Sequence, residues 1–171
     1  HPRASEAGAE VLAAGGNAAD AAAATMLALG VVSPASSGLG GGGFALYYRA
    51  SDRSLHYLDF REEAPAAATD DMFAARPGDT EEEAANRSRV GGLAVGVPGE
   101  PAGIERLIED FGSGEVTRSQ IARPAIRLAS EGFDAGPRIE RYTRWIGETL
   151  SQDPTFAPWF PEGETVIPAS A

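Results

Sequence analysis

Cysteine and lysine are both absent from the 171 residues of this chain, and histidine occurs only twice, at His1 and His56. Without cysteine, the chain has no disulfide, no thiolate metal site and no cysteine nucleophile. Without lysine, it has no lysine Schiff base and no phosphate-binding lysine. No metal-ligand partner stands at a defined spacing from His56, so we expect a strand residue there, no metal site and no cofactor.

Positive charge is also scarce, because 25 acidic residues face only 14 arginines and give a net charge of −11. A chain with this much negative charge repels the phosphate backbones of nucleic acids, so we expect no nucleic-acid partner. The longest apolar run, Ala18–Val32, includes Asp20 and is shorter than the roughly 20 residues of a membrane span. No basic segment precedes an apolar core with a cleavage site, so we expect neither a signal peptide nor membrane insertion by this segment.

Hydrophobic periodicity predicts an α+β chain. The first predicted elements are helices over Ala4–Ala14 and Ala18–Val32, the second capped by Asn17, and a hairpin of Phe44–Arg49 and Leu55–Arg61. A loop over residues 62–92 and a short strand at Leu93–Val97 follow. The last three elements are helices over Ile104–Phe111, from Thr117 to Gly132 with a kink or restart at Pro124, and over about Pro137–Leu150. The charged stretch Asp79–Glu83 reads as solvated surface. Length and composition fit one domain, so we treat residues 1–171 as a single-domain fragment.

A glycine cluster formally matches the dinucleotide-binding pattern G-x-G-x-x-G at Gly38, Gly40 and Gly43. That pattern requires a strand before the glycines and a helix after them, whereas the predicted order here is a helix followed by a strand. We therefore interpret the cluster as backbone that needs positive φ or very close packing, and not as a cofactor cradle.

Arg61 is the most interesting candidate site residue, because it stands where a predicted strand ends among acidic neighbours. Such an arginine can present its planar fork to a substrate carboxylate. The alternative is an internal ion pair with Asp59 or Glu62, and the local pattern alone favours this alternative.

Five ordered segments together resemble one family. They are Ala4–Gly8 with Gly15–Ala21, Ser36–Phe44, Asp59–Pro65, Gly92–Gly99, and Pro124–Ala129 with Glu131–Phe133. In order and spacing these segments resemble the large subunit of gamma-glutamyltranspeptidases, and the resemblance spans nearly the whole chain.

The resemblance implies part of a four-layer αββα sandwich of the N-terminal nucleophile hydrolase type. It also implies a zymogen that cuts itself, so that the new N-terminal threonine of a small subunit becomes the nucleophile. None of the eight threonines of this chain lies in the small-subunit motif. We therefore expect no catalytic residue in this chain, an inactive chain when it is alone, and a small subunit as its partner.

The same resemblance carries two substrate-binding positions to this chain. Arg61 matches the arginine that binds the substrate α-carboxylate in family members, and Glu62 matches the glutamate beside it, which steadies that arginine. With the family in view, the substrate role of Arg61 outranks the ion pair. Family members are often exported, which implies a periplasmic or extracellular location, although the sequence leaves a cytoplasmic one open.

Three functions remain open at this point. The first is the large-subunit part of a gamma-glutamyltransferase or glutathione hydrolase, which cleaves γ-glutamyl amides such as glutathione and transfers the γ-glutamyl group to water or to an amine. The second is a related cephalosporin or glutaryl acylase, or a poly-γ-glutamate-processing enzyme of the same fold. The third is a non-catalytic relative that acts as an interaction module.

Overall fold

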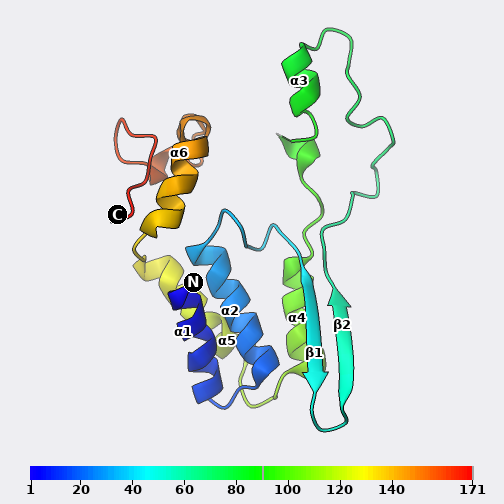
Figure 1. The fold of residues 1–171 in the computed structure, drawn as a ribbon, viewed down its shortest axis with the longest axis vertical. Coiled ribbons are helices and arrows are strands. Elements are labelled where there is room, and N and C mark those ends of the chain that lie inside the picture. The colour runs from blue at the N-terminus through cyan, green and yellow to red at the C-terminus, as the bar shows by residue number, and fades with distance from the viewer. Residues whose placement is uncertain (90, 171) are drawn as a thin grey trace. The chain divides into compact units, whose positions relative to one another are not determined.

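The computed structural model describes residues 1–89 and 91–170. Its elements are, in chain order, α1 (Pro2–Ala13), α2 (Ala18–Val32), β1 (Phe44–Arg49), β2 (Ser54–Asp59), α3 (Glu81–Asn86), the 3-10 turn η1 (Gly92–Ala94), α4 (Glu100–Phe111), α5 (Arg118–Glu131), α6 (Gly136–Gln152) and the 3-10 turn η2 (Ala157–Trp159) (Figure 1). The chain divides into two compact units. We call residues 1–38 with residues 104 onward the helical unit, and residues 39–103 the hairpin unit.

The helical unit is built on α1, α2 and α5, which lie side by side (Figure 1). α1 buries Ala4, Ala7 and Val11 at helical spacing, as the sequence predicts. α2 is apolar nearly all round and is therefore a helix that contacts neighbours on several sides. These helices place most of their small apolar side chains in one interior.

That interior consists of two hydrophobic clusters. The first contains Val11, Ala23, Ala24, Ile104, Val116 and Ile121, and the second contains Ala4, Ala7, Ala28, Val32 and Ala125. Among the described residues, every buried apolar side chain belongs to the helical unit. This unit therefore has a core of its own.

Asn17 and Asp20 connect the start of α2 to the end of α4. The Asn17 side chain accepts from the backbone N–H groups of the first turn of α2, as predicted, and its Nδ2 donates to the Phe111 carbonyl oxygen at 2.7 Å. Asp20, which is buried, accepts from the backbone N–H groups of Asn17 at 2.9 Å and Ser113 at 3.0 Å through one carboxylate oxygen. The two side chains thereby satisfy backbone groups that helix ends leave without partners.

α5 runs through Pro124 without a break, so of the predicted kink or restart the restart is wrong and the kink stays a prediction. A proline inside a helix removes one backbone hydrogen bond and costs about 3 kcal/mol. The Pro124 ring is fully buried against the core of the helical unit, and this burial offsets part of that cost. The sequence indicates the hydrogen bond that a proline removes, but it does not indicate that the Pro124 ring is buried.

The hairpin unit contains one two-stranded antiparallel sheet, in which Leu46 pairs with Tyr57 and Tyr47 pairs with His56. The turn between the strands is held by Asp52, whose carboxylate accepts from the Ser54 backbone N–H at 2.9 Å. The alternation of the strands puts one apolar face outward, with Phe44, Leu46, Tyr48, Leu55 and Tyr57 all exposed. We call these five side chains the hairpin face.

Three expectations for the hairpin unit are wrong. β2 ends at Asp59, two residues before Arg61, and the chain changes its pairing partner after Phe60, which still pairs with Gly43. Residues 93–97 form no strand and contain part of η1, with one isolated bridge between Val97 and Glu63. Within the predicted loop, α3 forms because Thr80 and Glu83 make a capping box.

Candidate functional site

Arg61 lies at a corner where the chain leaves one hydrogen-bonding partner and takes another. Before the corner, Phe60 exchanges backbone hydrogen bonds with Gly43, at 3.0 and 3.2 Å. After the corner, Glu63 exchanges backbone hydrogen bonds with Val97, at 2.8 and 3.3 Å. Arg61 is therefore held from both sides although it belongs to no regular element.

Close-packed glycines surround this corner. A Cβ on Gly99 would overlap the carbonyl oxygen of Phe60 and lie 2.7 Å from its carbonyl carbon. A Cβ on Gly42 would overlap the same oxygen and lie 2.8 Å from the Glu62 nitrogen. The two glycine segments are also joined, because the Gly41 carbonyl oxygen accepts from the backbone N–H of Gly99 at 2.9 Å. Only glycine permits so close a backbone approach.

Asp59 fixes the backbone at the corner. Its Oδ1 accepts from the Arg61 backbone N–H at 3.1 Å, and the Tyr57 hydroxyl donates to its other oxygen at 3.5 Å. Partial desolvation, and then the nearby Asp59 carboxylate, raise the pKa of Tyr57, which keeps the hydroxyl protonated as a donor. Asp59 thus supports Arg61 through the main chain.

The guanidinium of Arg61 is exposed and has no ion pair or hydrogen bond with any side chain in residues 1–89 and 91–170. The ion-pair alternative is therefore wrong for this structure, since Asp59 bonds the Arg61 backbone instead. Glu62 does not pair with Arg61 either. The Cβ atom of Glu62 lies 3.0 Å from the position that a Cβ on Gly96 would occupy. An unpaired planar fork on a rigid corner can bind a carboxylate with two parallel hydrogen bonds.

A family model described as Gamma-glutamyltranspeptidase matches residues 4–170. The chain belongs to the gamma-glutamyltranspeptidase family. The glutathione hydrolase proenzyme of Bacillus subtilis (strain 168) is 40% identical over 176 residues, which cover 98% of this chain and 29% of that protein. The chain spans less than a third of the length of the curated relatives it matches.

Solved structures agree with the family assignment. The crystal structure of Helicobacter pylori gamma-glutamyltranspeptidase matches with a TM-score of 0.86 and 38% identity, over 99% of this chain and 47% of that chain. A cephalosporin acylase from Bacillus halodurans matches less closely, with a TM-score of 0.74 and 30% identity over 98% of this chain and 31% of that one. The predicted fold class, an α+β part of the αββα sandwich of N-terminal nucleophile hydrolases, is confirmed by this likeness.

The glycine cluster has the packing role that its sequence predicts. Gly38 has a φ of 149°, and Gly42 packs against the Phe60–Glu62 backbone. A Cβ on Gly40, by contrast, would meet nothing within 4 Å. Gly42 therefore shapes the main chain at the corner that carries Arg61, whereas Gly40 takes no part in that packing.

The other sites considered in the sequence have ordinary surroundings. His56 lies on β2, as predicted, with its Nε2 2.7 Å from the Ser54 hydroxyl oxygen. In the part of the chain that the structure describes, no three His, Cys, Asp or Glu side chains come together as metal ligands. No described helix is both long enough and apolar enough to cross a membrane.

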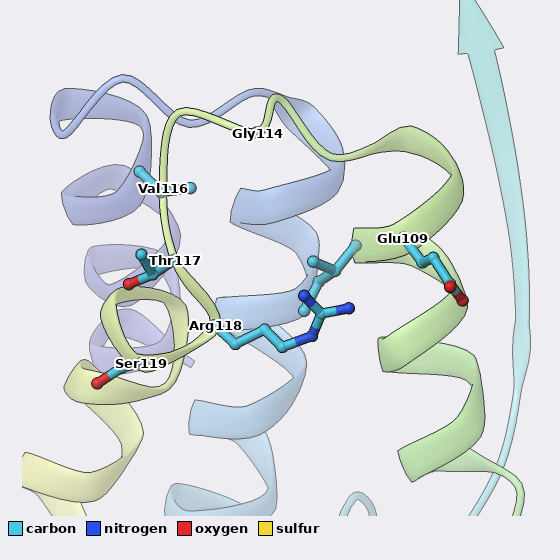
Figure 2. Close-up of a pocket in the computed structure, with 7 residues that line it drawn as sticks. Glu109, Gly114, Val116, Thr117, Arg118 and Ser119 are labelled. Atoms are coloured by element: carbon cyan, nitrogen blue, oxygen red, sulfur yellow. The ribbon is translucent and has the colours of Figure 1, made fainter.

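A shallow cavity of about 540 Å³ lies in the helical unit, between the end of α4 and the start of α5 (Figure 2). It is lined by Ile108, Glu109, Gly114, Val116, Thr117, Arg118 and Ser119. Arg118 extends toward α4, where its Nε donates to Glu105 at 2.8 Å. The one guanidinium in its lining is thus already paired, and the cavity presents no free cation to a ligand.

Sequence reasoning identified Arg61 but missed the residues that hold it in place. Gly99 and Gly103 contact the Phe60 residue from 39 and 43 positions further along the chain, and no local periodicity connects such distant positions. The sequence contains one signal for Gly99, because this residue ends Gly92–Gly99, one of the five segments that resemble the family.

Proposed function

We propose that this chain is the large-subunit part of a gamma-glutamyltransferase or glutathione hydrolase, as a single-domain fragment over residues 1–171. The complete protein cleaves γ-glutamyl amides such as glutathione and transfers the γ-glutamyl group to water or to an amine. The relatives named glutathione hydrolase proenzyme support this activity and a self-processed precursor. Arg61 binds the substrate α-carboxylate.

The observation that carries the proposal is the free guanidinium of Arg61 on a constrained backbone. Seven of the fourteen arginines pair with carboxylates, in eight ion pairs among the described residues. Arg61 has Asp59, Glu62 and Glu63 as chain neighbours and yet pairs with none of them. A fork kept free in this way is suited to a carboxylate that arrives with the substrate.

The chemistry itself belongs to the small subunit. There, the hydroxyl oxygen of an N-terminal threonine attacks the γ-carbonyl carbon while its own α-amine accepts the hydroxyl proton. An α-amine has a pKa of about 7.7–8.0, so it can act as base near neutral pH without a histidine. The C–N bond then breaks, the leaving amine takes the proton, and water or an acceptor amine attacks the resulting ester. Arg61 contributes by holding the other end of the substrate.

Glu62 is the second proposed binding residue. It follows Arg61 at the corner, is exposed, and makes no ion pair with Arg61 in the described structure. A carboxylate in this place can accept from the substrate α-ammonium, which lies beside the α-carboxylate that Arg61 binds. We therefore assign Glu62 to the α-ammonium of the same substrate. Glu62 then contacts the substrate in place of the expected contact to Arg61.

The hairpin face supports a protein partner. Five large apolar side chains lie exposed on a two-stranded sheet, with Leu46 71% exposed, and such a sheet is marginally stable on its own. We assign this face to the small subunit, which carries the nucleophilic threonine in the same proposal.

A second candidate function is that of an acylase, favoured by the match to the cephalosporin acylase structure. The two functions differ in the substrate group that Glu62 would meet, because a glutaryl side chain keeps the terminal carboxylate but carries no α-ammonium. Comparing kcat/KM of the full-length protein for γ-glutamyl and glutaryl anilides separates them. The proposed function predicts a preference for the γ-glutamyl compound, and a preference for the glutaryl compound would favour the acylase.

The test of the proposed function is Arg61→Lys in the full-length, processed protein. Lysine keeps the charge but loses the fork, so KM for L-γ-glutamyl-p-nitroanilide should rise about 10- to 150-fold, as expected for a charge-assisted contact of roughly 1.5–3 kcal/mol. Arg141→Lys is the matched control, since Arg141 is also exposed and without a partner in the described residues. An unchanged KM in Arg61→Lys would remove Arg61 from the site.

A further inference from the structure

We infer that Phe60 and Gly103 are positioning residues that set the direction of the Arg61 side chain, an inference that rests on the proposed substrate role of Arg61. Phe60 immediately precedes Arg61, and Gly103 lies in the first turn of α4 within the same hairpin unit. Neither residue offers a group that binds substrate. Their effect reaches the substrate through Arg61 alone.

The Phe60 ring occupies the space that a side chain at position 103 would fill. A Cβ on Gly103 would overlap the ring at Cγ and lie 2.5 and 2.7 Å from its two Cδ atoms. On another side the ring lies against Gly43, where a Cβ would stand 3.1 Å from Cε2. The overlap at Gly103 is with the root of the ring, so rotation of the ring about its own axis does not relieve it.

The backbone of Phe60 has no room to move instead. Its carbonyl oxygen accepts from Gly43 and is enclosed by the backbones of Gly42 and Gly99. On the far side, the N–H of Arg61 is held by Asp59 at 3.1 Å. A side chain at position 103 therefore pushes on a residue whose neighbours are fixed, and the displacement passes to the corner that carries Arg61.

Such a displacement matters for a fork that binds a carboxylate with two parallel hydrogen bonds. A misplacement of about 1 Å in a substrate-positioning group costs up to about 100-fold in rate. We expect Gly103→Ala in the full-length protein to raise KM for L-γ-glutamyl-p-nitroanilide about 10-fold or more, with kcat much less changed, because the reacting bond lies at the other end of the substrate.

The experiment compares four variants of the full-length, processed protein: Gly103→Ala, Phe60→Ala, the double variant, and Gly40→Ala. Phe60→Ala removes the Cγ and both Cδ atoms that a Cβ at position 103 would overlap, so the double variant should bring KM most of the way back from its raised value in Gly103→Ala. Independent effects on stability do not produce such a coupling. Gly40→Ala is the control, since its Cβ enters open space. It should behave as the unchanged protein.

A second probe distinguishes positioning from general damage. The same anilide with its α-carboxylate converted to a carboxamide has no charged partner for Arg61, so Gly103→Ala should leave its KM unchanged. Equal losses on both probes, or no recovery in the double variant, would overturn the inference. If Gly103→Ala yields no processed protein, Phe60→Ala alone carries the test: a raised KM confined to the carboxylate probe supports the inference, and unchanged kinetics on both probes contradict it.

Arg61→Lys, measured in parallel, separates the two proposals. A normal KM in Arg61→Lys would contradict the proposed function. A raised KM in Arg61→Lys together with a normal KM in Gly103→Ala would retain the proposed function and overturn the positioning role alone.

Discussion

The helical unit buries its apolar residues against one another, whereas the hairpin unit carries its large apolar side chains on the surface. All buried apolar residues among those described lie in residues 1–38 and from 104 onward, and the hairpin face is exposed on both strands. The two units therefore obtain order from different interactions. Helix packing holds the first, and close approach of glycine backbones holds the second around Arg61.

This difference separates stability from binding. A residue in the helical core acts mainly on the free energy of unfolding, because it contacts other apolar side chains and no candidate site residue. A residue around the Arg61 corner acts mainly on the direction of the Arg61 guanidinium. Variants in the two regions should accordingly change different measurements.

The largest expected effect on stability is in the helical unit. Ile121 is completely buried in the first core cluster, so Ile121→Ala should lower the free energy of unfolding of the full-length protein by about 2–5 kcal/mol. Urea denaturation measures this loss. Ile126→Ala is the control on the same helix, since Ile126 is 61% exposed and should lose less than about 0.5 kcal/mol. Equal losses at the two positions would contradict the assignment of the core.

A smaller effect is expected on the hairpin face. If the small subunit covers this face in the full-length protein, Leu46→Ala should lower the free energy of unfolding by about 1.5–3 kcal/mol, as for a buried leucine. Leu12→Ala makes the same change at an exposed leucine of the helical unit and should have little effect. A Leu46→Ala variant as stable as the parent would show that the face stays in solvent.

The smallest effect concerns the ion pair that joins α1 to α5. Arg127 donates to Glu10 at 2.7 Å, and this hydrogen bond lowers the pKa of the Glu10 carboxyl from its usual 4.5. A lowered folded-state pKa means that the pair stabilises the fold above the unfolded pKa and that this contribution is lost as pH falls through the folded value. Both side chains are nearly half exposed, so the contribution is at most about 1 kcal/mol.

Measuring the free energy of unfolding as a function of pH tests the direction of this contribution from the Glu10–Arg127 ion pair. Glu10→Gln should be slightly less stable than the parent at pH 7, and the difference should shrink as the pH falls below 4.5. Glu115→Gln, at an exposed carboxylate with no ion pair in the described residues, should show no such convergence. A difference between Glu10→Gln and the parent that grows on acidification would contradict the assigned role.

Local patterns predicted the elements whose cause is local. α2 and β1 have the predicted bounds, because Asn17 and Asp20 mark a helix start and alternation marks a strand. The restart at Pro124 and the strand at residues 93–97 were wrong, because burial of a ring and a single distant bridge decide those segments. Local sequence contains neither piece of information.

The candidate site shows the same division. Arg61 was chosen through a family resemblance, since the local pattern alone favoured an ion pair that the structure does not contain. The contacts that hold its backbone come from Gly42 and Gly99, on segments far apart in the chain. Such contacts depend on the tertiary fold, and a pattern of neighbouring residues does not encode them.

The most direct test of the account is a crystal structure of the full-length, processed protein with L-glutamate bound. The account predicts two Arg61 guanidinium nitrogens at about 2.7–2.9 Å from the two α-carboxylate oxygens, the distance of charge-assisted hydrogen bonds. It also predicts that the Phe60 ring still lies against Gly103. An α-carboxylate bound by other residues, with Arg61 directed into solvent, would contradict it.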